Sequence, residues 1–153
     1  MREEGKKVVA VNRKARHEYE IEESHEAGIV LTGTEIKSIR EGKANIQDAF
    51  ARIEGNEVWV HHMHISPYEA GNRYNVDPVR PRKLLLHRRE IERLRGKVEQ
   101  RGLTLIPLQL YLRGGRAKIE LGLARGKRLY DRREEIAKRT AARDVERAMR
   151  ERD

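Results

Sequence analysis

Three histidines within four positions, His61, His62 and His64, form the part of the sequence most suggestive of metal chemistry. On an extended strand, residues two apart lie on one face, so His62 and His64 could offer two imidazoles to a zinc ion. A structural zinc site needs four ligands, yet the chain has no cysteine and no carboxylate follows this run until Glu69. The sequence therefore predicts no metal here.

Candidate catalytic groups elsewhere are isolated. Ser38 lies in a predicted helix, without the sharp strand-to-helix turn of a nucleophile elbow, so we expect an ordinary surface serine. Glu35 and Asp48 could hold Mg²⁺ for nuclease chemistry, although scattered carboxylates are more often solvated. The glycine pair at 114–115 is not followed by the Lys-Ser/Thr of a phosphate-binding loop, which favours a hairpin turn. The sequence predicts neither an enzyme nor a cofactor.

The stronger chemical pattern consists of basic residues interleaved with rings. The stretch NRKARHEY contains Arg13, Lys14, Arg16 and Tyr19. Further on, RPRKLLLHRRE, residues 80–90, places five Lys or Arg and one His around three leucines. Cations can neutralise phosphates and rings can stack on unpaired bases, a combination that suits RNA better than duplex DNA. The formal net charge of +9 also favours a polyanionic partner. On composition alone, the alternative is a solvated basic surface.

These residues need a scaffold, and the runs that could build one lie within residues 8–125. Short apolar runs predict strands, and apolar residues three to four positions apart predict helices. The expected strands are 8–11, 19–22, 28–31, 50–54, 58–65, 103–112 and 116–124, the last four forming two hairpins. One helix is expected between Thr34 as N-cap and Gly42; another spans Leu84, Leu85, Ile91, Leu94 and Val98 and ends at Gly102, after a loop at 66–82. Pro107 suggests a strand edge or a bulge.

This content predicts a mainly β fold. Short antiparallel strands with about two to three flanking helices match an OB-like closed antiparallel β-barrel, a class that binds oligonucleotides with one face and its loops. We predict one barrel domain, 1–125, followed by a basic tail, 126–153. The N-terminus lacks the apolar core of a signal peptide and no apolar run approaches the ~18 residues of a membrane span. We therefore expect a cytoplasmic protein without a membrane partner.

Several sequence blocks resemble the signature blocks of the SsrA-binding protein family, the partners of transfer-messenger RNA (tmRNA, SsrA RNA) in bacterial trans-translation. They occur in the family's order over roughly residues 8–136: NRKARHEYEIEE, EAGIVLTGTEIKSIREGKANI, HISPYE, DPVRPRKLLLHRREIERL and GKRLYDRRE. The resemblance implies that the chain binds the tRNA-like domain of tmRNA and delivers it to stalled ribosomes. Elongation factor Tu with GTP and alanyl-tRNA synthetase are implied as indirect partners, and we expect a monomer. The alternative is a general single-strand RNA-binding or RNA-chaperone OB-fold protein.

The resemblance also implies which residues face the RNA. They are Asn12, Arg13, Lys14, Arg16, Tyr19, Glu26, Lys83, Leu85 and His87. Arg and Lys can neutralise phosphates, Tyr can stack on a base, and Glu can accept from an exocyclic amine or a 2′-hydroxyl. Leu85 could equally belong to the core, and Glu35 could either bind RNA or brace the fold.

Residues 126–153 carry ten Lys or Arg and seven Asp or Glu. Wound as a helix at about 100° per residue, they present a basic stripe but no strong apolar face, so we expect a tail that is disordered in isolation. The resemblance implies that the tail becomes helical on the ribosome, in the decoding site and the empty messenger channel. The implied contacts are Gly126, Lys127, Arg128, Tyr130, Asp131, Arg132 and Arg133.

Overall fold

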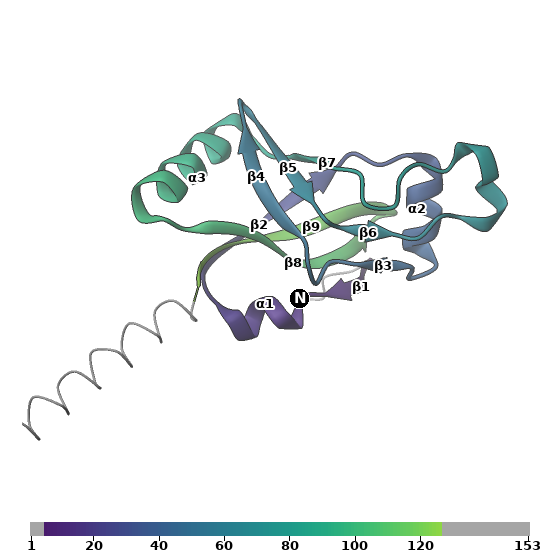
Figure 1. Ribbon diagram of the computed structural model, residues 1–153, viewed down its shortest axis with the longest axis horizontal. Helices are drawn as coiled ribbons and strands as arrows, with labels where there is room; N and C mark the ends of the chain where they lie inside the picture. The colour runs from purple at the N-terminus through teal and green to yellow at the C-terminus, as the bar shows by residue number, and fades with distance from the viewer. Residues whose placement is uncertain (1–4, 127–153) are drawn as a thin grey trace, which may run out of the picture.

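The computed structural model describes residues 5–126, apart from the side chains of 71–73 (Figure 1). Along the chain, the elements are β1 (Lys6–Val11), α1 (Arg13–Glu18), β2 (Tyr19–Ile29), α2 (Gly33–Arg40), β3 (Ala44–Asn45), β4 (Phe50–Glu54), β5 (Glu57–His61), β6 (His64–Ile65), the 3-10 helix η1 (Glu69–Tyr74), β7 (Arg82–Leu85), α3 (Arg88–Arg101), β8 (Thr104–Arg113) and β9 (Arg116–Gly126). None of the helices within this part of the chain is long and apolar enough to cross a membrane.

Six strands are joined in a closed circuit of antiparallel pairs. The large sheet has the order β1-β8-β4-β5-β7-β2-β9. Because β9 also pairs with β8, the strands from β8 to β9 form the closed circuit, and β1 is added at its edge. The β4–β8 link rests on the single register pair Ala51↔Leu105, whereas β2–β9 and β8–β9 pair along most of their lengths. Strands β3 and β6 form a separate two-stranded sheet. The expectation of a mainly β fold with two to three helices is confirmed.

The inner faces of these strands form the main core. On β9, Ala117, Ile119, Leu121 and Leu123 are buried at every second position, as expected when one face of a strand points inward. They belong to one apolar cluster with buried residues of the other strands and of α2 and α3, including Ile39, Val58, Val60, Leu84, Leu94 and Leu110. Helices α2 and α3 are therefore held to the sheet by apolar contacts.

Helix α1 packs on the opposite face of β8 and β9. Ala15 forms a second small apolar cluster with Ile106, Leu108 and Ala124. Gly122 makes this packing possible, because a Cβ at that position would lie only 2.7 Å from Cδ1 of Leu108. The helix that carries the basic first block is thus seated directly on the sheet (Figure 1).

Helix α3 is joined to β2 by ion pairs as well as apolar contacts. The Glu23 carboxylate lies 2.8 Å from Nη1 of Arg93 and 2.8 Å from Nζ of Lys97. Hydrogen bonds from Lys97 and His25 outweigh the effect of burial and lower the pKa of Glu23 to about 2. This half-buried face of β2 is polar, so it carries little of the apolar alternation by which strands are recognised.

Several expected boundaries are wrong for identifiable reasons. β2 is one strand of 11 residues rather than two short ones, because its middle faces α3 with polar groups. Leu84 and Leu85 lie on β7 and not in the following helix, which begins only at Arg88. The N-cap of α2 is Thr32, whose side chain accepts from the Glu35 N–H, and not Thr34. Helix α1 was not expected at all, since only one of its six residues is buried.

Other expectations are confirmed. The two hairpins form as β4–β5 and β8–β9. The register of the second hairpin shifts between Pro107 and Gln109, so the proline lies at a bulge. Gly102 ends α3 with φ 64°, a left-handed conformation that glycine adopts without a steric penalty.

Candidate RNA-binding surface

The first group of predicted RNA-binding residues lies on α1 and the start of β2. Arg13, Lys14 and Arg16 are exposed, and Tyr19 is half-buried at the first position of β2. Their backbone is fixed because α1 packs through Ala15 on the sheet. The three cations therefore project from an anchored helix, so binding of a ligand to them would not require the backbone to be ordered first.

Asn12 differs from its neighbours because it is only 1% exposed. Its Nδ2 donates to the carbonyls of Ile46 and Pro107, at 3.1 and 3.0 Å, and its Oδ1 accepts from the Ala15 N–H at 3.0 Å. The side chain thus caps α1 and ties it to β8 and to the segment after β3. This geometry favours a positioning role for Asn12 over direct contact with RNA.

A second group surrounds a surface hollow of about 390 Å³ between β2, β7, β9 and the start of α3. The structure brings together three predicted RNA-binding residues there, Glu26, Leu85 and His87. Leu85 is 53% exposed, so the alternative that it belongs to the core is wrong. Gly28 pairs with Leu85 across β2 and β7, and a Cβ at Gly28 would lie 3.3 Å from the Leu85 Cβ. A larger residue at Gly28 would crowd the leucine that borders the hollow.

Lys118 of β9 also lines this hollow, and sequence reasoning missed it. It pairs with Gly28 in the β2–β9 register and is half-buried. The signal was present in the predicted hairpin, since Lys118 alternates with the apolar residues Ala117 and Ile119 and must face outward. With Leu86 and Glu90 also in its lining, the hollow combines two leucine side chains, an imidazole, two carboxylates and an ammonium group.

The carboxylate of Glu26 already has protein partners. It accepts a hydrogen bond from Nη1 of Arg113. Burial, together with a hydrogen bond to Glu26, raises the pKa of Tyr111 to about 12. These contacts orient Glu26 at the edge of the hollow while leaving lone pairs that could accept from a ligand.

Lys83 lies two residues before Leu85 on the outward face of β7, but it does not line the same hollow. Its Nζ is 2.6 Å from Oε2 of Glu57, and both side chains are more than a third exposed. Such a pair is weak in water, so the lysine can exchange its carboxylate partner for a phosphate at little cost.

Comparisons with known proteins show which family the chain belongs to. The sequence model of the family described as SmpB protein matches residues 9–151. The chain belongs to the SmpB protein family. The SsrA-binding protein of Carboxydothermus hydrogenoformans is 63% identical over 146 residues, covering 95% of this chain and 98% of the relative. That of Geobacillus thermodenitrificans is 61% identical, covering 95% and 94%.

A solved structure supports the same membership. It is described as "tmRNA-SmpB: a journey to the center of the bacterial ribosome". Its matching chain is 58% identical to this one with a TM-score of 0.65, covering 76% of this chain and 82% of the other. The SmpB fold is thus shared over most of the described residues.

In this SmpB family member, the single strand over 58–65, on which His62 and His64 were expected to share one face, does not form. β5 ends at His61, and His62 has φ 61°, so His62 and His64 do not share one continuous strand. Within residues 5–126, no group of three or more His, Asp or Glu side chains could hold a metal ion. The absence of a metal remains a prediction.

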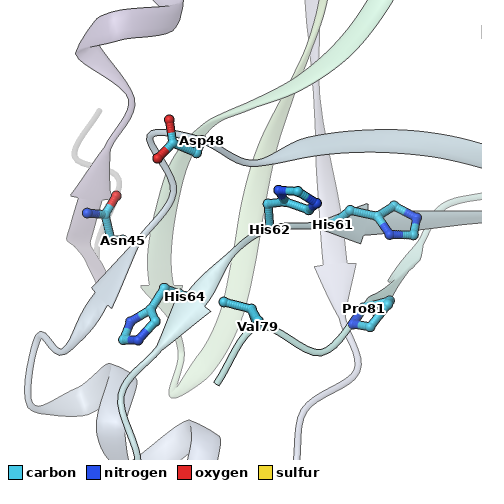
Figure 2. Close-up of a pocket in the computed structure, with 7 residues that line it drawn as sticks. All are labelled: Asn45, Asp48, His61, His62, His64, Val79 and Pro81. Atoms are coloured by element: carbon cyan, nitrogen blue, oxygen red, sulfur yellow. The ribbon is translucent and has the colours of Figure 1, made fainter. Parts of the chain in front are cut away.

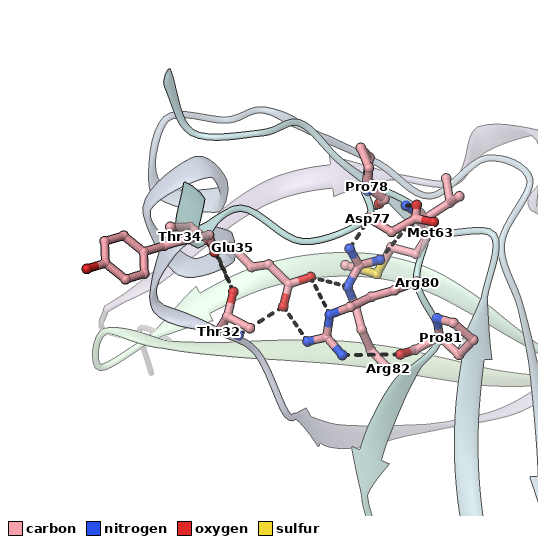
Figure 3. Close-up of polar contacts among 11 residues, drawn as sticks. Thr32, Thr34, Glu35, Met63, Asp77, Pro78, Arg80, Pro81 and Arg82 are labelled. Atoms are coloured by element: carbon pink, nitrogen blue, oxygen red, sulfur yellow. Dashed lines mark hydrogen bonds and ion pairs between the residues drawn. The ribbon is translucent and has the colours of Figure 1, made fainter. Parts of the chain in front are cut away.

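Ser38 and Glu35, the residues considered for catalysis, are more buried than expected. Ser38 is completely buried, rather than being a surface serine. Glu35 is 3% exposed and is bonded to Arg80 and Arg82, not to Asp48 (Figure 3). Glu35 therefore braces the fold, which decides between the two roles that the sequence left open.

The predicted tail begins at the edge of the described chain. Gly126 is the last residue of β9 and pairs with Tyr19 of β2, so it belongs to the sheet. Lys127, Arg128, Tyr130, Asp131, Arg132 and Arg133 lie outside the described residues. Their assignment stays a prediction.

Proposed function

We propose that the chain binds the tRNA-like domain of tmRNA and delivers it to stalled ribosomes for trans-translation. The observation that carries the proposal is the gathering of Glu26, Leu85, His87 and Lys118 around one hollow in a member of the SmpB family. The matching solved structure is described with tmRNA and the bacterial ribosome, and the two curated relatives are SsrA-binding proteins. These relatives support the choice of this RNA over other polyanions.

The proposed binding surface has two parts joined by β2. Tyr19 begins the strand beside the cations of α1, and Gly28 lies near its other end beside Leu85. At about 3.3 Å per residue, the two ends are at most about 30 Å apart, a separation that would let the protein contact separate regions of a folded RNA. We further propose that the circuit of six strands is an OB-like closed barrel.

Each group has a defined chemical task in this proposal. Arg13, Lys14 and Arg16 neutralise phosphates, and Tyr19 stacks on a base. At the hollow, Leu85 packs against a base or sugar, and Lys118 attracts the phosphate backbone of the RNA. In this proposal the protein contributes to trans-translation by binding RNA and not by catalysis.

The rest of the proposal concerns the C-terminal tail, the cellular location and the indirect partners. The tail, which follows Gly126, occupies the decoding site and the empty messenger channel, where ribosomal RNA offers phosphates to its arginines. The protein acts as a cytoplasmic monomer, and elongation factor Tu with GTP and alanyl-tRNA synthetase act on the RNA that it carries.

Affinity measurements with a matched pair of variants test the proposal. Leu85→Ala should weaken binding of the tRNA-like domain about fivefold to a hundredfold, as expected when one stacked or packed base contact is lost. Val30→Ala should leave affinity unchanged, because Val30 is similarly exposed, at 46%, but does not line the hollow. Equal affinities for the tRNA-like domain and for a generic single-stranded RNA would instead favour the general RNA-binding alternative.

A further inference from the structure

A second hollow, of about 450 Å³, lies on a part of the surface that the proposed function does not use. We call it the histidine hollow, and seven residues line it: Asn45, Asp48, His61, His62, His64, Val79 and Pro81 (Figure 2). None of the residues that the family resemblance assigns to RNA binding is among them. It nevertheless borders the α1 region, because Asp48 also lines a neighbouring hollow with Lys14 and Tyr19.

Aromatic rings are gathered along one side of the histidine hollow. The His61 imidazole is stacked on Phe50, with ring centroids 5.3 Å apart and planes 17° apart. The His62 imidazole is tilted against the same phenyl ring at 5.1 Å. His62 is exposed and has no hydrogen-bond partner within the described residues, so its ring is supported by Phe50 and open to solvent. Such a supported ring can stack on a flat ligand.

The backbone of His62 is also unusual. Its φ of 61° makes it the one residue other than glycine with a left-handed conformation among those described. Glycine would adopt this conformation without a steric penalty, whereas a side chain there costs free energy. A side chain kept in an unfavourable backbone conformation is an indication of function.

The opposite side of the hollow is apolar and firmly held. Val79 is 47% exposed, and Pro81 follows it by two residues. Between them, Arg80 donates to both oxygens of the buried Glu35, at 2.5 and 3.2 Å, and to the Pro81 carbonyl at 3.3 Å (Figure 3). The position of the apolar wall is therefore set before any ligand binds.

The polar groups at one end select the type of ligand. The Asn45 Oδ1 accepts from the Gln47 N–H at 2.9 Å, which leaves the amide nitrogen as a donor. The Asp48 carboxylate is an acceptor, and its charge disfavours a phosphate inside the hollow. Lys14 lies outside, with its Nζ 3.4 Å from Asp48, where it can take a phosphate. A base edge with both donors and acceptors fits these groups, with its backbone at the rim.

We propose that the histidine hollow binds one unpaired RNA base, stacked on His62 and packed against Val79. The inference rests on the proposed function only for the class of partner, RNA. It adds a third contact region, beside α1 and away from the hollow around Leu85. An RNA strand whose phosphate contacts Lys14 could place the next base in the histidine hollow.

Two variants of the full-length chain and one control test this proposal. His62→Gly removes the ring and suits the left-handed backbone, and Val79→Ser removes the apolar wall without touching Arg80. Val8→Ser is the control, since Val8 is 46% exposed, lies on β1 and does not line the hollow. The probes are the tRNA-like domain RNA and a single-stranded RNA of about eight nucleotides, the latter also carrying 4-thiouridine for crosslinking.

We expect His62→Gly and Val79→Ser each to weaken binding of the short RNA about fivefold or more, the range for loss of one stacked base. Val8→Ser should have no effect, and crosslinks in the unmodified chain should map to the residues around His62. Wild-type affinity in His62→Gly, an equal loss in Val8→Ser, or loss of binding on adding EDTA would overturn the proposal. If the two variants behave as expected but the tRNA-like domain does not bind, the proposed function fails and the histidine hollow stands.

Discussion

Replacing Glu35 by glutamine should strongly destabilise the protein. The carboxylate is 3% exposed and accepts from the Thr32 N–H at 2.9 Å, from Arg80 and, at 2.6 Å, from Nε of Arg82. Arg82 is completely buried and also donates to the carbonyls of Met63 and Pro78. Glutamine has nearly the same shape, but it leaves a buried guanidinium without a counter-charge and points an N–H group toward it.

The expected loss follows from the burial of this pair. Removing one partner of a buried ion pair costs about 3–5 kcal/mol, because the other charge stays buried without compensation. Small proteins are stable by about 5–15 kcal/mol, so the variant should remain folded but lose a large share of its stability. With a urea slope of about 1–3 kcal/mol per M, the unfolding midpoint should fall by at least about 1 M. The single tryptophan, Trp59 on β5, gives the fluorescence signal.

Glu57→Gln is the matched control. Glu57 pairs with Lys83, the residue next to Arg82, but the two side chains are 44% and 39% exposed. Exposed pairs contribute about 0–1 kcal/mol, so this change should barely move the midpoint. An effect of Glu35→Gln below about 1 kcal/mol, or no larger than that of Glu57→Gln, would refute the reasoning from burial.

The same comparison should depend on pH. Burial raises the pKa of Glu35, but hydrogen bonds from Arg80, the Thr32 N–H and Arg82 outweigh it, so the pKa lies below the ordinary value of 4.5. A carboxyl group with a lowered folded-state pKa stabilises the fold above its unfolded-state pKa, and that contribution is lost as the pH falls through the folded value. The free-energy difference between Glu35→Gln and the unmodified protein should therefore be constant above about pH 5 and shrink in acid.

Four further measurements extend these predictions. Asn12→Ala should lower the free energy of unfolding by about 2–4 kcal/mol, because it leaves buried carbonyls unpaired and removes the cap of α1, and unfolding in urea measures this. Glu23→Gln should be destabilised by about 2 kcal/mol at pH 6, and its difference from the unmodified protein should shrink as the pH falls toward 2, where Glu23, with a pKa of about 2, is half protonated. RNA affinity should fall steeply with salt, since several phosphates are contacted, and nearly equal affinities at two ionic strengths would contradict this. A chain ending at Gly126 should still bind tmRNA but fail to support alanine transfer on a stalled ribosome, and Asp131→Ala with Arg133→Ala should reproduce most of that failure.

The sequence could predict elements whose stability comes from alternating apolar residues. The two hairpins have this property, because every second residue of β9 enters the core. It could also predict the outward direction of Lys118 once β9 was recognised. The grouping of Glu26, Leu85 and His87 was different, since only the resemblance selected these residues and only the strand register brings them together.

Elements held by polar contacts were missed because periodicity does not report them. The middle of β2 is joined to α3 through Glu23, so a strand face that is half-buried looks like a solvated stretch. Asn12 is a stronger case, because its partners Ile46 and Pro107 lie 34 and 95 residues away along the chain. A buried asparagine with distant partners and an exposed asparagine that contacts RNA look the same in sequence.

The buried network around Glu35 connects the stability of the fold to its surface. Arg82 anchors the start of β7 by donating to the carbonyls of Met63 and Pro78. Arg80 fixes the segment around it by donating to the Glu35 carboxylate and to the carbonyl of Pro81. Because Val79 and Pro81 flank Arg80, the wall of the histidine hollow depends on the Glu35–Arg80 ion pair, neither member of which lines the hollow. Glu35→Gln should therefore weaken binding of the short RNA even under conditions in which the variant is fully folded. Binding of the tRNA-like domain should change less, because β7, which carries Leu85, is also held by its pairing with β2 and β5.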